Sequence, residues 1–250
     1  MEEKLGQIFK FLQQNRSYNK TLQEKHYRSV IKPYDNVTDK VVSLLYHIAN
    51  TQSQPKINSL ATFYKNIYQN IECLNSFGSF INKIKPNNST EITYKGLYQS
   101  MKSQPGFGEK TSALFTKSIF HLHNGQYSDE LRIWNDVPVG IEEKDDFYLP
   151  VDSVIIAIFK KIDNNQNWNF DNINAKIKEY YHGQDIEVWD DLWFWGFITQ
   201  NGSGDNRTFQ WNENKYWALQ ETDKNQEEID LIKNKAETFL EIFENINQSH

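Results

Sequence analysis

Apolar residues recur at intervals of three and four positions along most of the chain, which is the spacing of one buried face of an α-helix. In the first 75 residues the spacing predicts three helices, through Leu5, Ile8, Phe9, Phe11 and Leu12, through Val41, Val42, Leu44, Leu45 and Ile48, and through Leu60, Phe63, Ile67, Ile71 and Leu74. Further helices are predicted at about 76–84, 91–102, 109–123, from Asp152 onward, and at 173–181, 189–199 and 225–247. The pattern therefore indicates an all-α protein.

Proline and glycine interrupt the pattern at Gln54-Pro-Lys, Lys85-Pro-Asn-Asn-Ser and Pro105-Gly-Phe-Gly. Residues 124–149 lack clear periodicity, and we interpret them as a long connection or an insertion that loops out of the fold. Residues 209–219 are expected to form a short hairpin or an irregular segment.

Composition narrows the class of protein. The chain has 250 residues, of which 38% are hydrophobic, and this is enough for a compact globule. Its longest apolar runs, 154–159 and 192–198, are much shorter than the roughly 20 residues that span a bilayer. No transmembrane helix and no secretory signal are expected, so we predict a cytoplasmic protein. Cys73 is the only cysteine, which excludes an internal disulfide, a cysteine-rich zinc site and a four-thiolate iron–sulfur cluster.

Charge is distributed unevenly along the chain. Residues 1–125 hold 16 Lys and Arg against 8 Asp and Glu, whereas residues 126–250 hold 11 against 25. A polyanion is attracted by local basic surface, so the acidic net charge of −6 does not exclude a nucleic-acid partner. Charge drift with no functional meaning is the alternative interpretation.

The most informative segment is Gln104-Pro-Gly-Phe-Gly-Glu-Lys-Thr-Ser-Ala-Leu-Phe115, which joins two predicted helices. Gly106 and Gly108 permit a tight connection and leave backbone N–H groups bare at the start of the second helix, where an anion such as a DNA phosphate is favoured. With Lys110 two residues after the second glycine, the segment closely resembles the hairpin of the helix-hairpin-helix DNA glycosylases. That superfamily includes endonuclease III and 8-oxoguanine glycosylase.

Three other segments, within residues 41–200, agree with this resemblance. Leu149-Pro-Val-Asp-Ser-Val-Ile155 is similar to the family's Pro-Val-Asp segment, whose aspartate is catalytic and begins a helix. Ala49-Asn-Thr-Gln-Ser-Gln54 resembles the segment whose glutamine wedges into the DNA stack, which implies that role for Gln52. Trp189-Asp-Asp-Leu-Trp-Phe-Trp-Gly196 resembles the helix that follows the catalytic aspartate. The 42 residues between Lys110 and Asp152 exceed the family's usual separation, which requires the 124–149 insertion.

The resemblance implies a two-lobed helix-hairpin-helix DNA glycosylase fold. Residues 33–125 would form a six-helix barrel lobe, and residues 1–32 with 126–250 a second helical lobe. Lys110 and Asp152 would be catalytic and would face one another across the cleft between the lobes. Gln52, Gly106, Phe107, Gly108 and Thr111 would bind DNA. No metal or iron–sulfur cluster is expected, although a monovalent cation could be held by carbonyl groups of the hairpin.

These residue types fit a base-excision reaction. A lysine amine can attack C1′ of deoxyribose and form a Schiff base, and a helix N-terminus together with desolvation would favour its neutral form. An ionised aspartate would stabilise the positive charge that develops on the sugar. Taken singly, Lys110 reads as a solvated surface charge, Asp152 as a helix cap, and the tryptophans at 189, 193 and 195 as core residues.

We therefore expect a monomeric DNA glycosylase with abasic-site lyase activity. Its substrate would be duplex DNA with a damaged base, such as an oxidised purine like 8-oxoguanine, or with a modified base of invading DNA. One alternative is a helix-hairpin-helix protein that binds DNA without chemistry. Another is a helical protein-interaction domain, which the acidic second half would suit.

Overall fold

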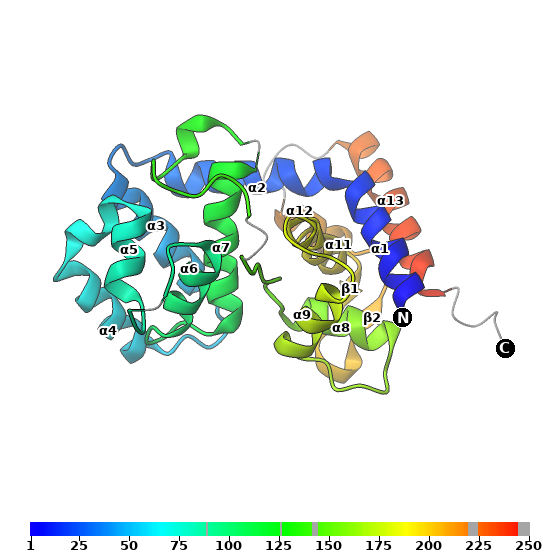
Figure 1. Ribbon diagram of the computed structural model, residues 1–250. Helices are drawn as coiled ribbons and strands as arrows, with labels where there is room; N and C mark the ends of the chain where they lie inside the picture. Colours follow the sequence, from blue (N-terminus) through cyan, green and yellow to red (C-terminus); the bar gives the residue numbers. More distant parts are fainter. Residues whose placement is uncertain (89, 126, 142–144, 220–224, 245–250) are drawn as a thin grey trace. The chain divides into compact units, whose positions relative to one another are not determined.

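The computed structural model describes residues 1–88, 90–125, 127–141, 145–219 and 225–244, and the described chain is mostly helical (Figure 1). The predicted all-α class is confirmed. The α-helices are α1 (Glu2–Gln14), α2 (Arg16–Ile31), α3 (Val37–Asn50), α4 (Ile57–Tyr68), α5 (Phe77–Ile84), α6 (Tyr94–Lys102), α7 (Glu109–Asn124), α8 (Ser153–Ile162), α9 (Phe170–Lys178), α10 (Asp185–Trp189), α11 (Asp191–Ile198), α12 (Glu213–Leu219) and α13 (Gln226–Glu244). Short 3₁₀ turns are η1 (Ile71–Asn75), η2 (Asp129–Leu131) and η3 (Gly204–Asn206). Two-residue strands β1 (Gln200–Asn201) and β2 (Thr208–Phe209) pair antiparallel.

The chain divides into two compact units. The central unit comprises residues 23–150 and 182–186, and the terminal unit comprises residues 1–22, 151–181 and 187–250. The hairpin and Lys110 therefore belong to the central unit, whereas Asp152 belongs to the terminal unit. None of the helices in the described residues is both long and apolar enough to cross a membrane.

The core of the central unit is aromatic. Phe77 and Phe80 both pack on Trp134, with ring centroids 5.9 and 5.7 Å from that of the indole. The Trp134 indole also donates a hydrogen bond to the Leu74 carbonyl at 2.7 Å. Trp134 lies in the stretch expected to loop out as an insertion.

The described residues of 124–149 pack onto the central unit instead of looping out of it. Several of their apolar side chains are fully buried, namely Leu131, Ile133, Trp134, Phe147 and Leu149. The sequence gives no periodic signal here because these side chains are buried one at a time from irregular backbone. The segment is thus part of this unit's core.

Two aspartates of the same segment cap helices that precede it. The Asp136 carboxylate accepts hydrogen bonds from Phe77 N (2.8 Å) and Gly78 N (2.9 Å) at the start of α5. The Asp145 carboxylate accepts from Tyr94 N (2.9 Å) and Lys95 N (2.6 Å) at the start of α6. A carboxylate at these positions satisfies free N–H groups and interacts favourably with the helix dipole.

The terminal unit is built around the apolar helix α11. Trp195 is fully buried and packs on Phe11 of α1 at a ring separation of 4.9 Å, and Phe11 packs in turn on Phe239 of α13. Within this unit α1 and α13 lie side by side (Figure 1). On its other side α11 contacts α8 very closely, since a Cβ on Gly196 would lie 2.6 Å from the side chain of Ile158.

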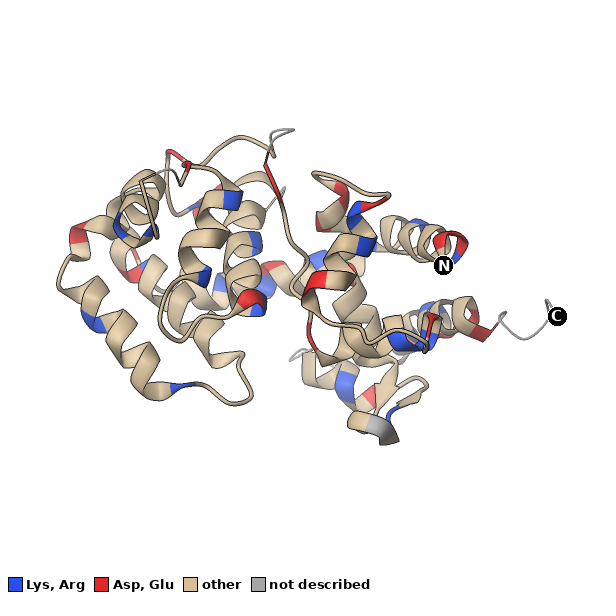
Figure 2. Cartoon of the chain, turned by 60° about the horizontal axis from the view of Figure 1, so that its bottom comes forward, with Lys and Arg blue, Asp and Glu red and all other residues tan. Residues whose placement is uncertain are grey.

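The division into units changes the interpretation of the charge pattern. The central unit carries 14 Lys and Arg against 14 Asp and Glu, because the acidic segment before residue 150 belongs to it. The unit that holds the hairpin is therefore balanced in charge. Figure 2 shows acidic and basic residues interspersed over the helices of each unit.

Candidate functional site

The hairpin between α6 and α7 is a tight turn whose conformation depends on Gly106. Its φ of 86° lies in the left-handed region, and a Cβ there would come within 2.9 Å of the backbone nitrogen of Leu60. Phe107 N donates to the Gln104 carbonyl at 3.2 Å, which closes the turn. The glycine is thus required by both conformation and space.

Gln52 and Phe107 hold this turn against the rest of the central unit. Gln52 Nε2 donates to the Gly106 carbonyl at 3.2 Å, and the Phe107 ring packs on Phe63 with centroids 4.8 Å apart. Phe107 is buried, so it offers a ligand only its backbone. The structure therefore brings together Gln52, Gly106 and Phe107, as the sequence leads us to expect for one site.

Thr111 has an internal role in the same hairpin. Its Oγ1 accepts from Gly108 N at 3.0 Å and lies 3.1 Å from the Gly108 carbonyl, to which it donates. Thr111 is buried, so its hydroxyl stabilises the helix start and is not exposed to a ligand. Gly108 itself is exposed, and a Cβ on it would meet nothing within 4 Å.

Lys110 occupies the first turn of α7 and is half-buried. Its ammonium has no hydrogen bond or ion pair within the described residues. The adjacent Glu109 pairs with Lys102 at 2.6 Å, so its carboxylate is engaged away from Lys110. The first N–H groups of α7 have no partner within the helix, which makes this end suitable for an anion.

Asp152 caps α8 in the terminal unit. Its Oδ1 accepts from Val154 N (2.8 Å) and Ile155 N (3.2 Å). Its Oδ2 accepts from the Trp193 indole Nε1 at 2.9 Å. Because Lys110 and Asp152 belong to different units, their proximity stays a prediction.

The surroundings of Asp152 contain side chains that the sequence did not single out as functional. Trp193 stacks on Phe197 with centroids 4.9 Å apart and an interplanar angle of 14°, and both rings are half-buried. Lys215 Nζ lies 4.9 Å from the Phe197 centroid, and burial together with the nearby Arg207 charge lowers the pKa of Lys215. Arg207 donates to Ser153 Oγ at 3.3 Å.

Tryptophan spacing alone could not have identified this arrangement. Trp189 and Trp195 are fully buried, as expected for core residues, whereas Trp193 is only half-buried. Trp193 and Trp195 lie in one apolar run, and the difference between them arises from which face of α11 turns toward the start of α8.

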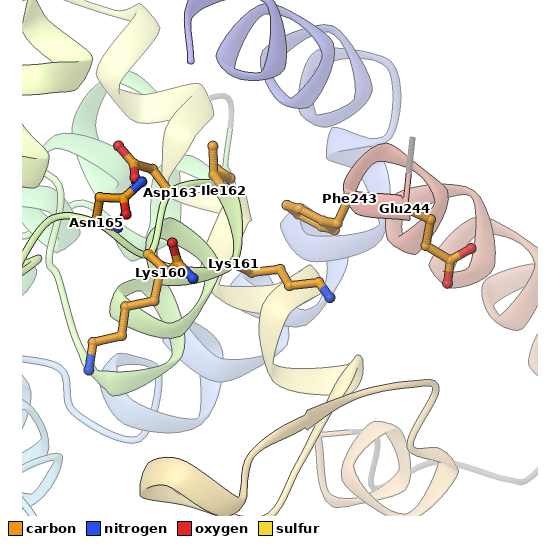
Figure 3. A pocket seen from close by; sticks show the side chains of 8 residues that line it. Lys160, Lys161, Ile162, Asp163, Asn165, Phe243 and Glu244 are labelled. Carbon is orange, nitrogen blue, oxygen red and sulfur yellow. Dashed lines mark hydrogen bonds between the residues drawn. The ribbon is translucent and has the colours of Figure 1, made fainter. Parts of the chain in front are cut away.

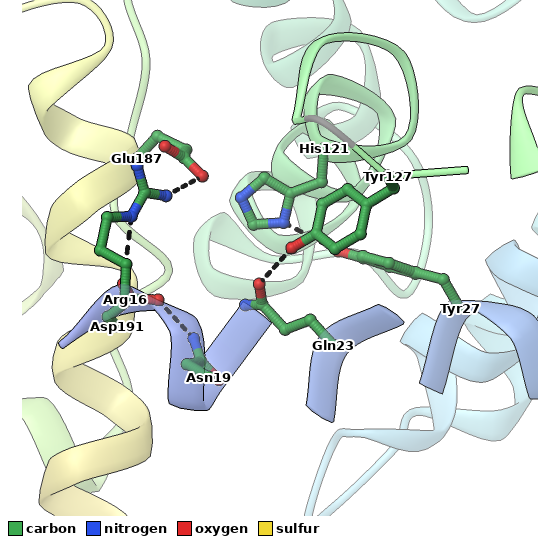
Figure 4. A network of polar contacts seen from close by, with 8 residues as sticks. All are labelled: Arg16, Asn19, Gln23, Tyr27, His121, Tyr127, Glu187 and Asp191. Atoms are coloured by element: carbon green, nitrogen blue, oxygen red, sulfur yellow. Dashed lines mark hydrogen bonds and ion pairs between the residues drawn. The ribbon is translucent and has the colours of Figure 1, made fainter. Parts of the chain in front are cut away.

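Four other aspartates, at positions 145, 146, 190 and 191, would be the alternative acids if Asp152 were not the catalytic one, and they have structural roles. Asp145 caps α6, and Asp146 Oδ2 accepts from the Tyr148 hydroxyl at 2.7 Å. Asp190 and Asp191 are buried, and burial raises the pKa of Asp191 to about 7. Arg16 pairs with Asp191 at 3.3 Å, and with Glu187 (Figure 4). Asp152 is thus more exposed than Asp190 and Asp191, the two aspartates at the start of α11.

A second polar network lies within the central unit. The Tyr127 hydroxyl donates to Gln23 Oε1 at 2.7 Å, and the Tyr27 hydroxyl lies 3.1 Å from His121 Nδ1 (Figure 4). Next to it the His26 and His47 rings are 4.3 Å apart, and burial, together with the nearby His47 and Lys117, lowers the pKa of His26 to about 4. His26 therefore stays neutral near pH 7.

The residues that could hold a metal or cofactor are few. The described chain has no group of three His, Cys, Asp or Glu side chains suited to a metal ion, and Cys73 is buried. The hairpin carbonyls of Gln104 and Gly106 each already accept one hydrogen bond, which leaves one lone pair on each for a monovalent cation.

A pocket in the terminal unit lies away from these residues. Lys160 and Lys161, at the end of α8, form one wall, and Phe243 and Glu244 of α13 form another (Figure 3). None of the sequence-predicted site residues described above is among those that line it.

Comparison with known proteins finds no matching protein-family model, no matching curated protein and no matching solved structure.

Proposed function

We propose that this chain is a DNA glycosylase with abasic-site lyase activity, which removes a damaged or modified base from duplex DNA. An oxidised purine is the leading substrate class, and the fold would be the two-lobed one of the helix-hairpin-helix glycosylases. Lys110 is the nucleophile, and Asp152 is the carboxylate that stabilises the sugar as the base departs.

The observation that carries the proposal is the exposed glycine at the start of α7. Gly108 has an extended backbone, with φ of −106° and ψ of −176°, and open space where a side chain would be. Neither strain nor crowding requires glycine there, and Ser, Asp or Asn would cap the helix better. A glycine in front of free N–H groups is favoured where a ligand's phosphate approaches the backbone closely.

The proposed reaction uses the neutral amine of Lys110. Its Nζ attacks C1′, the C1′–N bond to the base breaks, and the base leaves with the bonding electrons and takes up a proton. The amine gives its proton to the departing base. The C1′–O4′ bond then breaks and O4′ takes a proton from water, which opens the sugar ring and leaves a protonated imine between Lys110 and C1′. Removal of a C2′ proton then breaks the bond to the 3′ phosphate. Asp152, whose carboxylate is held in place by three hydrogen-bond donors, offsets the positive charge that grows on the sugar.

The proposal is tested with duplexes that each carry one lesion. Borohydride reduces the imine to a stable amine, so wild-type protein should become covalently attached to the duplex that holds its substrate. Lys110→Gln should abolish the adduct and leave DNA binding largely intact. Asp152→Asn keeps the shape of the cap, so the fold should survive while excision slows by about 100-fold or more.

The matched control is Lys65→Gln, which removes the same charge from an exposed lysine on α4 of the same unit and should leave trapping intact. The double variant Lys110→Gln with Asp152→Asn should lose no more than Lys110→Gln alone, because both residues serve one step. An adduct that persists in Lys110→Gln would assign the nucleophile to another amine. If the wild-type protein binds DNA but forms no adduct with any lesion, it is a DNA-binding protein without glycosylase activity.

The wedge assignment of Gln52 is tested separately. Gln52→Ala should weaken excision from paired duplex more than from mismatched substrate, because unpairing a mismatch costs less. Equal loss on both substrates would instead reflect loss of the hydrogen bond that holds Gly106.

A further inference from the structure

The two carboxylate oxygens of Asp152 accept different numbers of hydrogen bonds. Oδ1 accepts two backbone N–H groups, from Val154 and Ile155, whereas Oδ2 accepts one donor, the Trp193 indole. Each carboxylate oxygen has about two acceptor positions. Oδ1 is therefore fully used by the helix cap, and Oδ2 keeps one position for a further group.

Two features set the position of the indole. Its ring stacks on Phe197, one helical turn later on α11. Gly196 lets α11 approach α8 so closely that a methyl group there would collide with Ile158 and Val154. The close packing of α11 on α8 and the stacking on Phe197 thus fix the position of the indole relative to the start of α8.

Trp193 also differs from the buried tryptophans next to it. The indole N–H groups of Trp189 and Trp195 have no acceptor within the described residues, so burial of their rings is enough to place them. The N–H of Trp193 reaches a carboxylate from a ring that is not fully buried. Its hydrogen bond therefore contributes to the geometry of Asp152 beyond what packing requires.

We propose that Trp193 is a positioning residue for the excision reaction, a role that rests on the proposed function. It fixes Oδ2 so that the remaining acceptor position of this oxygen is presented to the sugar. Asp152 consequently acts as a fixed anion, with its three hydrogen bonds maintained through the reaction, and does not take up the proton of the nucleophile.

The hydrogen bond itself is tested without DNA. In a spectrum of the indole N–H groups, the signal that Trp193→Phe removes belongs to Trp193. That signal should move upfield in Asp152→Asn, since an amide oxygen is a weaker acceptor than a carboxylate. Glu213→Gln is the control, because Glu213 accepts from the Trp217 indole at 3.1 Å and should move the Trp217 signal instead. A Trp193 signal that does not respond to Asp152→Asn would overturn the inference.

The positioning role is tested by single-turnover excision. Trp193→Phe keeps a ring on Phe197 and removes only the N–H, and it should lower the excision rate by about 10- to 100-fold, the range for a hydrogen bond to a charged group. DNA affinity should not change. Trp217→Phe, which removes the matched indole, should excise at the wild-type rate.

The double variant separates positioning from folding. Trp193→Phe should cause no further loss in the Asp152→Asn background, whereas a merely structural role would slow both backgrounds equally. A wild-type rate in Trp193→Phe would overturn the inference while the proposed function stands. Failure of wild type on every lesion would overturn the proposed function, and the role of Trp193 with it, while the indole spectrum would still report whether the hydrogen bond exists.

Discussion

Gly106 and Gly108 of the hairpin differ in why they are glycine: the fold requires it at Gly106 and does not require it at Gly108. Alanine at the two positions should therefore have different effects. Gly106→Ala places a methyl group against Leu60 at a positive φ, so we expect the free energy of unfolding to fall by about 2 to 4 kcal/mol. Gly108→Ala has open space and an ordinary φ, so we expect a change within about 1 kcal/mol. Urea denaturation measures both.

The same pair distinguishes a folding residue from a binding residue. If a phosphate approaches the start of α7, Gly108→Ala should weaken DNA binding in a protein that is fully folded. Unchanged affinity in Gly108→Ala would remove the central argument for an anion at this position.

At the residue scale, the sequence located Gln52 and the hairpin glycines in one neighbourhood because they belong to turns, where residue type reports backbone conformation. It did not identify the buried state of Phe107, because Phe63, on which the ring packs, meets it only in the folded chain. Trp193 was missed for the same reason, since its partner Asp152 lies 41 residues earlier.

At the element scale, α2 and α12 show the limits of periodicity. In α2 buried apolar residues gather at the C-terminal end, at Tyr27, Val30 and Ile31, and buried Asn19 replaces an apolar position earlier in the helix. Helix α12 was expected to be a hairpin or irregular, and this was wrong. It has seven residues and one buried side chain, Tyr216, so its sequence contains too few turns for a pattern.

The attachment of residues 131–134 to α7 predicts a pH dependence. His123 Nε2 lies 3.3 Å from Ile133 N, from which it accepts a hydrogen bond, and burial lowers the pKa of His123 to about 4. The unfolded chain takes up this proton near pH 6.5, so the unfolded state binds more protons between these values. The free energy of unfolding should therefore fall as the pH is lowered from 6.5 to 4.

Calorimetry of His123→Gln across this range checks the origin of the effect. Glutamine can still accept a hydrogen bond but does not titrate, so the fall should become smaller, with the remainder owed to groups such as His26. The exposed His182 is the matched control, and His182→Gln should leave the dependence unchanged. A fall of the same size in both variants would argue against His123.

At the scale of the whole molecule, the fold class could be predicted but the division of charge could not. The halves of the sequence differ by charge, whereas the central unit contains equal numbers of acidic and basic residues. Part of the acidic charge is used internally, since Glu130 pairs with Arg28 while Asp136 and Asp145 cap helices. Charge counted along a chain does not report which side chains share a surface.

Because of this charge balance, we expect the affinity for DNA to depend only weakly on salt concentration. With no net positive charge on the unit that holds the hairpin, we expect contact with roughly four phosphates or fewer, and so a slope of log affinity against log salt no steeper than about −4. Titration of a fluorescent duplex at several salt concentrations measures it. A slope near −8 would indicate a basic surface that the unit's composition does not suggest.

The caps supplied by Asp136 and Asp145 also bear on the order of folding. Each aspartate lies 50 or more positions further along the chain than the helix residues that it caps, and the separation of Phe77 and Asp136 is 59 positions. Closing so long a loop is slow, so α5 should assemble with its first turn still open. Asp136→Ala should therefore accelerate unfolding and leave the refolding rate nearly unchanged in a chevron experiment, whereas Ser76→Ala, which removes the local cap of α5 at Ser79 N, should also slow refolding. The segment that carries Asp136 and Asp145 therefore docks last during folding. Once docked, it slows the unfolding of the native state.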